Sequence, residues 1–440
     1  MKRYQLLLWS FTVSLGGFLF GFDTAVISGG EQAIQQQWGL SDLVLGQMVA
    51  MALYGTVIGA LFGGIPTDRI GRKKTLFWIA ILYLVSAAGS ALAPDVWWLM
   101  FFRFIGGLGV GASSVAAPMY ISEIAPAAKR GRLTAMFQFN LVLGILMAYF
   151  SNYLIGSGEG DGWRWMLGIE VFPAILYTIM ILFVPESPRW LITNKGQVEE
   201  ARRILRIADA ASADEAVASI HVKEPGSASH WSAFISGKFK FPILLAFLIA
   251  FFNQVSGINA VIYYAPRIFN MTGMGDDAAL LSSAGIGVVN LVFTMLGLAL
   301  IDKMGRRFLM YIGSIGYIVS LAAVAIAFFT ESFSGIMVPL WLFVFIASHA
   351  VGQGAVIWVF IAEVFPNEVR AYGQSLGCST HWVLAAIISA TFPVVASHFG
   401  GGPVFAFFSV MMVFQLLFVW RIMPETKGVS LEELERRLTR

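Results

Sequence analysis

Two residues of opposite charge lie deep inside apolar stretches of this 440-residue sequence. Asp23 lies six residues before Gly29, near which its apolar stretch ends. Arg103 lies six residues after Trp97, near which its own apolar stretch begins. A charge at the centre of a membrane helix costs roughly 2.5–3.5 kcal/mol on insertion scales, so each needs a partner or a task. At about 1.5 Å per residue, both side chains are expected roughly 9 Å below one membrane surface, where they can pair.

The pair has two interpretations. An aspartate beside an arginine stays ionised, but movement of the helices can loosen the pair and let the aspartate bind a proton. The pair therefore predicts either a proton switch or a static salt bridge that joins two helices.

Uncharged polar residues and one tryptophan also lie inside apolar stretches, namely Gln138, Asn253, Gln254, Asn259, Asn290, Trp358 and His381. Amides and a neutral imidazole can each donate and accept hydrogen bonds. Each alone is typical of a hydrogen bond between two membrane helices.

The elements that position these residues are predicted to be membrane helices. The sequence is 58% hydrophobic and 12% charged, whereas a soluble domain carries about 25% charged residues. Stretches long enough to cross a bilayer occur near 6–28, 43–66, 75–94, 97–122, 133–155, 164–184, 241–267, 279–301, 308–329, 338–362, 372–396 and 402–423. The net charge of +3 and the lack of a basic-aromatic cluster argue against nucleic acid. A single cysteine, Cys378, excludes internal disulfides.

The basic residues predict the orientation. If the N-terminus is cytoplasmic, all but three of the 29 Lys and Arg residues lie on the cytoplasmic side. The exceptions are Arg103 and, at the outer ends of two spans, Arg164 and Arg267. Acidic residues, Glu31 among them, occupy the outer loops instead. Both termini are therefore expected to be cytoplasmic.

Three charged motifs occur twice in the same order. The first motif, Asp68-Arg69 followed by Gly71-Arg72, is repeated as Asp302 followed by Gly305-Arg306. The second, Glu123, Pro126 and Arg130, is repeated as Glu363, Pro366 and Arg370. The third, Pro185-Glu186, is repeated as Pro424-Glu425. The offsets are 234, 240 and 239 positions, which indicates a duplicated unit. Duplicated halves in a hydrophobic chain are typical of alternating-access transporters.

The predicted fold is therefore all-α, with 12 transmembrane helices in two pseudo-symmetric six-helix bundles and short cytoplasmic helices. The expected domains are an N-terminal bundle at 1–190, a cytoplasmic helical linker at 191–240, a C-terminal bundle at 241–428 and a cytoplasmic helix at 429–440.

The sequence resembles the sugar porter family of the major facilitator superfamily along essentially its whole length. The matching strings are GGFLFGFDTAVISG at 16–29, RFIGGLGVG at 103–111, PESPRWL at 185–191, GINAVIYYAP at 257–266 and PETKG at 424–428. The resemblance implies the major facilitator fold and the transport of a monosaccharide across a bacterial-type inner membrane. Proton-linked members have an acid at the position of Asp23, so proton symport is expected.

The resemblance also implies the sugar site. A sugar has a ring of hydroxyls and apolar faces, which amides and an aromatic side chain suit. Gln254 and Asn259 are expected to contact ring hydroxyls, with Gln138 and Asn290 reaching in from either side. Trp358 is expected to cover the sugar from the cytoplasmic side. Phe20 is a weaker candidate for an apolar contact.

Two positions depart from the family pattern. Asn253 stands where many relatives have glutamine, and its amide reaches less far. His381 stands where relatives usually have an amide. It is expected either to hydrogen-bond as a neutral ring or to titrate near neutral pH and add a second proton-sensitive step.

Two gates are expected. Gly257 can break span 7 and place Tyr263 and Tyr264 on a mobile outer segment that closes over the sugar in this family. On the cytoplasmic face, charged residues can bridge the two halves while that face is closed, namely Asp68, Arg69, Arg72, Glu123, Arg130, Glu186, Arg189, Asp302, Arg306, Glu363, Arg370 and Glu425. Their basic members have a second interpretation, as signals that set membrane topology alone.

The sequence thus predicts a monomeric proton:monosaccharide symporter whose partners are the sugar, the proton and the lipid bilayer. Alternatives are a proton-independent sugar uniporter of the same fold and a sugar sensor that does not transport. No nucleophile–base set, phosphate loop or metal-ligand spacing is visible, so no enzyme activity, cofactor or metal is expected.

Overall fold

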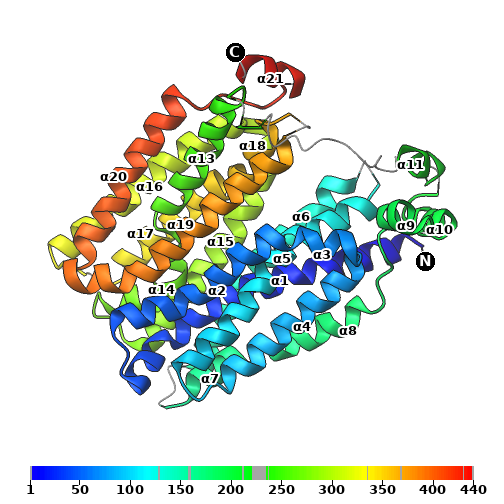
Figure 1. The fold of residues 1–440 in the computed structure, drawn as a ribbon. Coiled ribbons are helices and arrows are strands. Elements are labelled where there is room, and N and C mark those ends of the chain that lie inside the picture. The colour runs from blue at the N-terminus through cyan, green and yellow to red at the C-terminus, as the bar shows by residue number, and fades with distance from the viewer. Residues whose placement is uncertain are drawn as a thin grey trace. The chain divides into compact units, whose positions relative to one another are not determined.

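The computed structural model describes residues 2–126, 129–156, 160–210, 213–220, 234–235, 237–333, 335–366, 369–429 and 431–438. Within these ranges the chain forms helices and no strands (Figure 1). The predicted all-α fold is therefore confirmed. Parts of the predicted linker at 191–240 and of the predicted helix at 429–440 lie outside the described residues.

The first half of the chain contains six membrane-spanning elements, as predicted. They are α1 (Lys2–Trp38), α2 (Asp42–Phe62) with α3 (Gly64–Arg69), α4 (Arg72–Ala91), α5 (Val96–Ile124), α6 (Arg130–Ile155), and α7 (Gly162–Gly168) with α8 (Val171–Ile181). Local signals mark their ends. Asp95 starts α5, because its carboxylate accepts hydrogen bonds from the backbone N–H groups of Trp97 and Trp98 at 2.9 and 3.1 Å.

The second half contains six further spanning elements. They are α13 (Lys240–Val255) with α14 (Ile258–Asn270), α15 (Asp276–Met304), α16 (Arg306–Phe329), α17 (Met337–His349) with η2 (Ala350–Gly354) and α18 (Ala355–Glu363), α19 (Arg370–Phe399), and α20 (Gly401–Arg421). Two elements depart from a straight α-helix. Span 7 breaks at Gly257, as predicted, and span 10 contains the π-helical turn η2.

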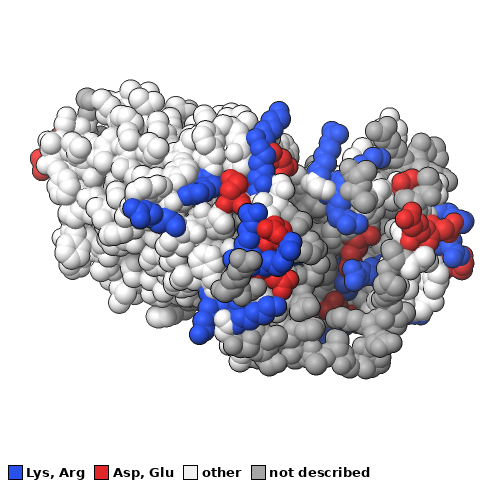
Figure 2. Space-filling view, turned by 90° about the horizontal axis from the view of Figure 1, so that it is seen from above, with Lys and Arg blue, Asp and Glu red and all other residues white. Residues whose placement is uncertain are grey.

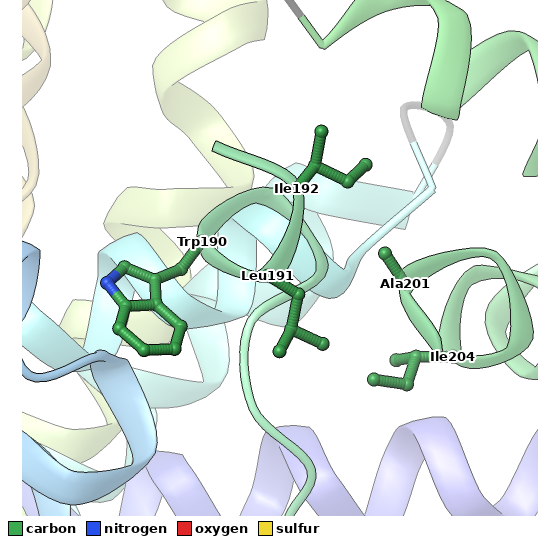
Figure 3. Close-up of a cluster of buried hydrophobic side chains, with 5 residues drawn as sticks. All are labelled: Trp190, Leu191, Ile192, Ala201 and Ile204. Carbon is green, nitrogen blue, oxygen red and sulfur yellow. The ribbon is translucent and has the colours of Figure 1, made fainter. Parts of the chain in front are cut away.

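Short helices follow each half, namely α9 (Pro188–Lys195), α10 (Val198–Ala208), α11 (Ala213–Ser219) and α21 (Leu431–Leu438). Ser187 caps α9, and Gly196 ends it with a φ of 65°. Leu191 of α9 packs with Ala201 and Ile204 of α10 (Figure 3). Trp190 points away from α10 (Figure 3). Its indole N–H donates to the backbone O of Asp68 at 2.8 Å, so this helical segment is tied to the first bundle.

Contacts divide the chain into two compact units. The first unit contains residues 1–26, 51–148 and 164–227, and the second contains 27–50, 149–163 and 228–440. The far ends of spans 1, 2 and 5, opposite the repeated charge motifs, thus belong with the second-half helices. We call the end that carries the repeated motifs the motif end, and the other end the opposite end.

Candidate functional site

Asp23 and Arg103 form a buried ion pair within the first unit. Nη1 of Arg103 lies 3.0 Å from Oδ1 of Asp23 and 3.3 Å from its backbone O. The Arg103 side chain is 1% exposed, and the Asp23 side chain is 5% exposed. Gly106, on the same helix α5, allows close packing against α4, because a Cβ there would lie 2.4 Å from Oγ of Ser86. The structure thus brings these two residues together, as their equal expected depth in the membrane predicts.

Glu170 is a third charged residue of this cluster, and the sequence reasoning missed it. It lies at the break between α7 and α8, it is 3% exposed, and it interacts electrostatically with Asp23 and Arg103. Its Oε1 and two nitrogens of Arg103, Nε and Nη2, have no hydrogen-bond partner among the described residues. The signal was available, because Glu170 lies six residues inside the predicted span at 164–184. One guanidinium therefore has two buried carboxyl groups as neighbours.

Three amides predicted for the sugar site meet at the break of span 7 in the second unit. Asn253 and Gln254 lie near the end of α13, and Asn259 lies in the first turn of α14. Asn259 Nδ2 donates to Gln254 Oε1 at 2.8 Å, and Gln254 Nε2 donates to Asn253 Oδ1 at 2.9 Å. Gly257 permits the break, since its φ is 82° and a Cβ there would lie 2.4 Å from the Phe408 ring.

His381 joins the same cluster from α19. Nε2 of Gln254 lies 3.1 Å from Nδ1 and 3.2 Å from Nε2 of the His381 ring. An imidazole nitrogen that accepts from this amide carries no proton. The ring centroid of Trp358 lies 5.0 Å from that of His381, so an aromatic surface borders the amides. Trp358 is 36% exposed, which leaves part of this ring open to a ligand.

The other predicted sugar contacts are placed as follows. Asn290 on α15 is 8% exposed, and its Oδ1 accepts a hydrogen bond from Thr294 at 3.3 Å. Phe20 on α1 and Gln138 on α6 lie in the first unit, where Phe20 is buried and Gln138 is half-buried. Their role as sugar contacts remains a prediction. No group of three His, Cys, Asp or Glu side chains in the described part of the chain could hold a metal ion.

The predicted outer gate, α14 with Tyr263 and Tyr264, is tightly held within the second unit. Both tyrosines are at most 2% exposed. Tyr264 donates to the backbone O of Ser389 at 2.7 Å, and its φ of −126° marks a kink. Tyr149 of α6 donates to the backbone O of Ile262 at 2.6 Å. Residues from both sequence halves therefore fix this segment.

A buried ion pair also holds α14, and it corrects one prediction. Glu31 does not lie in an outer loop, because α1 continues as far as Trp38. The Glu31 side chain is 0% exposed and pairs with Arg267 of α14 through two bonds of 2.8 and 2.6 Å. Arg267 also donates to Oε1 of Gln35 at 2.6 Å. The helix α1 is thereby joined to α14.

The motif end of the first half carries a compact charged cluster. Arg72 forms a bidentate pair with Glu123, with Nε–Oε2 and Nη2–Oε1 distances of 3.0 Å each. Oε1 of Glu186 accepts from the backbone N–H groups of Arg72 and Lys73 at 2.9 and 3.1 Å, at the start of α4. A carboxylate is favourable there because the first N–H groups of a helix lack partners within it. A Cβ at Gly71 would lie 2.3 Å from Glu186 Oε2, so this contact needs glycine.

The second half repeats this cluster almost bond for bond. Arg306 forms a bidentate pair with Glu363 at 3.1 and 2.7 Å. Glu425 accepts from the backbone N–H groups of Arg306 and Arg307 at 3.0 Å each, at the start of α16. A Cβ at Gly305 would lie 2.6 Å from Glu425 Oε2. The repeated motifs therefore build the same local structure in each half.

These contacts place most of the predicted cytoplasmic-gate residues within their own half. Asp68 and Asp302 pair with Arg72 and Arg306 at 3.2 and 3.1 Å. Arg370 donates to the backbone O of Phe365 at 3.3 Å. Arg69 is exposed, and Arg130, Arg189 and Glu123 line a cavity of about 500 Å³ in the first unit. Bridging between the halves remains a prediction.

Charged side chains gather at the end of the molecule where α21 lies (Figure 2). The cluster of the second half reaches this end, since Thr426, a few residues before α21, donates to Glu363 at 2.6 Å. Polar and charged groups outside the membrane are expected to concentrate in this way at an interface with water.

Comparisons with known proteins agree on one family. The family described as "Sugar (and other) transporter" matches residues 9–438. The chain is 38% identical over 434 residues to a D-xylose transporter of Levilactobacillus brevis, covering 97% of this chain and 94% of the relative. It is 38% identical over 442 residues to an arabinose-proton symporter of Bacillus subtilis (strain 168), covering 98% and 94%.

Solved structures show the same similarity in three dimensions. An inward-open structure of the xylose transporter of E. coli matches with a TM-score of 0.85 and 34% sequence identity. The match covers 98% of this chain and 99% of that structure.

Proposed function

Because the chain belongs to the sugar transporter family, we propose that it is a proton-coupled monosaccharide symporter that works by alternating access. The single observation that carries this proposal is the buried Asp23–Arg103 pair with Glu170 beside it. A proton-independent carrier has no need to bury this costly cluster in a membrane helix bundle. The similarity to proteins named as sugar-proton symporters supports the same interpretation.

The proton is proposed to bind at the Asp23 cluster. One buried arginine can neutralise one carboxylate, so the second carboxyl group is best accommodated when it holds a proton. A proton that binds to Asp23 itself removes the charge of that carboxylate, weakens its attraction to Arg103 and lets α1 and α5 move apart. Protonation thus favours the state in which α1 and α5 have moved apart, whereas the intact ion pair favours the state in which they are together.

The sugar is proposed to bind at the amide cluster of the second unit. Asn259, Gln254 and Asn253 present donors and acceptors, His381 adds an acceptor, and Trp358 provides an apolar face. The resemblance alone adds Asn290, Phe20 and Gln138 to this site. A pentose or a hexose fits this chemistry.

We further propose that the motif end is cytoplasmic, with both termini inside and the chain acting as a monomer in the inner membrane. The excess of Lys and Arg at the motif end supports this orientation. The opposite end then forms the outer gate around α14. The charged clusters at the motif end form the cytoplasmic gate, with Arg130 and Arg189 as candidates for contacts between the halves.

Uptake into proteoliposomes tests the proposed function. Purified protein is reconstituted, and labelled D-xylose, L-arabinose, D-glucose and D-galactose are supplied with and without an inward proton gradient. We expect at least one sugar to accumulate above its external concentration only when the gradient is present. Uptake that merely equilibrates in both conditions would identify a uniporter, and no uptake of any sugar would support the sensor.

A further inference from the structure

We propose that Gln353 and Gln415 are positioning residues that fix the hydrogen-bonding direction of the sugar-site amides. Both side chains are 0% exposed, and they come from η2 and α20. Buried amides inside a membrane bundle are costly unless each polar atom finds a partner. This proposal rests on the proposed role of Asn253, Gln254 and Asn259 in sugar binding.

A continuous row of hydrogen bonds connects the site to these two glutamines. Asn253 Nδ2 donates to Gln353 Oε1 at 3.4 Å, and Gln353 Nε2 donates to Gln415 Oε1 at 2.9 Å. Gln415 Nε2 donates to Ser314 Oγ at 2.8 Å, and the Ser314 hydroxyl donates to the backbone O of Met310 at 2.7 Å. We call Gln353, Gln415 and Ser314 the relay. The relay joins spans 10, 12 and 9 in the second unit, and it reaches span 7 through Asn253.

Two backbone carbonyls set the direction of the whole row. Gln353 Nε2 also donates to the backbone O of Ile249 at 3.3 Å. A carbonyl only accepts, so the nitrogen of Gln353 faces Ile249 and its oxygen faces Asn253. At the other end, Ser314 gives its only hydrogen to a backbone carbonyl, so its oxygen must accept from Gln415. The contact with Ile249 at one end and the contact with Ser314 at the other therefore require the same orientation of the two glutamine amides.

The consequence reaches the sugar site. Because the Asn253 nitrogen is directed to Gln353, the Asn253 oxygen accepts from Gln254, and the Gln254 oxygen in turn accepts from Asn259. An approaching sugar then meets a fixed order of donors and acceptors. Without the relay, each amide could rotate by half a turn and exchange its donor for its acceptor. Two sugars that differ in the direction of one hydroxyl would then be distinguished less well.

The test measures sugar selectivity in relay variants. Dissociation constants are measured for two pairs of C4 epimers, D-xylose with L-arabinose and D-glucose with D-galactose, using the purified full-length chain. The variants are Gln353→Leu, Gln415→Leu and the milder Ser314→Ala. We expect affinity for the preferred epimer to fall roughly 3- to 10-fold, the effect of losing one hydrogen bond. The preference between epimers should fall with it, because the poorer epimer loses less.

Ser409→Ala is the matched control. Ser409 is also on α20, is 7% exposed, and donates to the backbone O of Ile318 on α16 at 3.1 Å, outside the relay. Its removal should leave the epimer preference unchanged. An unchanged preference in all folded relay variants, or an equal change in Ser409→Ala, would overturn the relay alone. A wild type that binds none of the four sugars would instead overturn both the proposed function and the relay.

Discussion

Replacing Asp23 with asparagine should abolish the accumulation of sugar against a gradient and leave sugar exchange intact. Asparagine has nearly the same shape, but its amide does not ionise and cannot bind and release the transported proton. A proton gradient of one pH unit supports at most about tenfold accumulation at one proton per sugar. In Asp23→Asn this ratio should fall to one. Counterflow of labelled sugar between equal concentrations should continue, because exchange requires no net proton movement.

The control for this experiment is Asp277→Asn, which removes an exposed carboxylate at the start of α15. It should accumulate sugar as the wild type does. If Asp23→Asn still accumulates sugar when a proton gradient is applied, the ion pair is a static link between α1 and α5, and coupling lies elsewhere. Loss of both accumulation and counterflow would indicate a folding or binding defect.

Breaking the Glu31–Arg267 pair should open the outer gate. Both groups pair inside the second unit, and removing one partner from a buried ion pair typically costs about 3–5 kcal/mol, because the remaining charge is left unpaired. In Arg267→Gln the closed outer gate should lose this stabilisation, and the population with α14 moved away should rise by at least about tenfold. The substitution Ser389→Cys, in a Cys378→Ser background, can report the population in which α14 has moved away. Ser389 is 0% exposed and lies against Tyr264.

The measurement is the rate at which a membrane-impermeant maleimide, added from outside, modifies the thiol that Ser389→Cys introduces. Tyr149→Phe removes one neutral hydrogen bond to the same segment and should raise the rate only about 2- to 10-fold. The double variant Glu31→Gln with Arg267→Gln leaves no unpaired charge and should return part of the way to the wild type. A labelling rate in Arg267→Gln equal to that of the parent with the intact pair would show that the pair does not control this gate.

Sequence reasoning predicted the architecture because its signals are long and repeated. Apolar stretches of membrane length are unmistakable, and the duplicated motifs form the same cluster in each half, around Arg72 with Glu123 and around Arg306 with Glu363. The break at Gly257 was also predictable, since glycine is favoured where φ is positive. These features depend on local sequence.

The missed residues depend on partners that are distant in sequence. The sequence predicts a loop at Glu31 because the apolar stretch ends before it, yet α1 continues and Arg267, 236 positions on, compensates its charge. Gln353 and Gln415 each look like an ordinary buried amide in a membrane helix, and only the structure joins them over 62 positions. Glu170 is different, because its position inside a predicted span already marked it. Pairing of buried polar groups therefore has to come from the structure.

In the proposed mechanism the proton binds at Asp23–Arg103–Glu170 in the first unit, and the sugar binds at Asn259–Gln254–Asn253 in the second. Coupling then requires that sugar binding in one unit and protonation in the other favour the same state of the transporter. The α14 segment begins at the proposed sugar-site amides, and near its end Arg267 pairs with Glu31 of α1, the helix that also carries Asp23.

The most direct test is whether sugar moves protons. Proteoliposomes with equal pH on both sides receive D-xylose, or whichever of the four sugars is transported, and the external pH is followed. We expect the external medium to become more alkaline as sugar enters, and this change to be absent in Asp23→Asn. Sugar uptake by the wild type with no change in external pH would contradict proton coupling and leave a uniporter in its place.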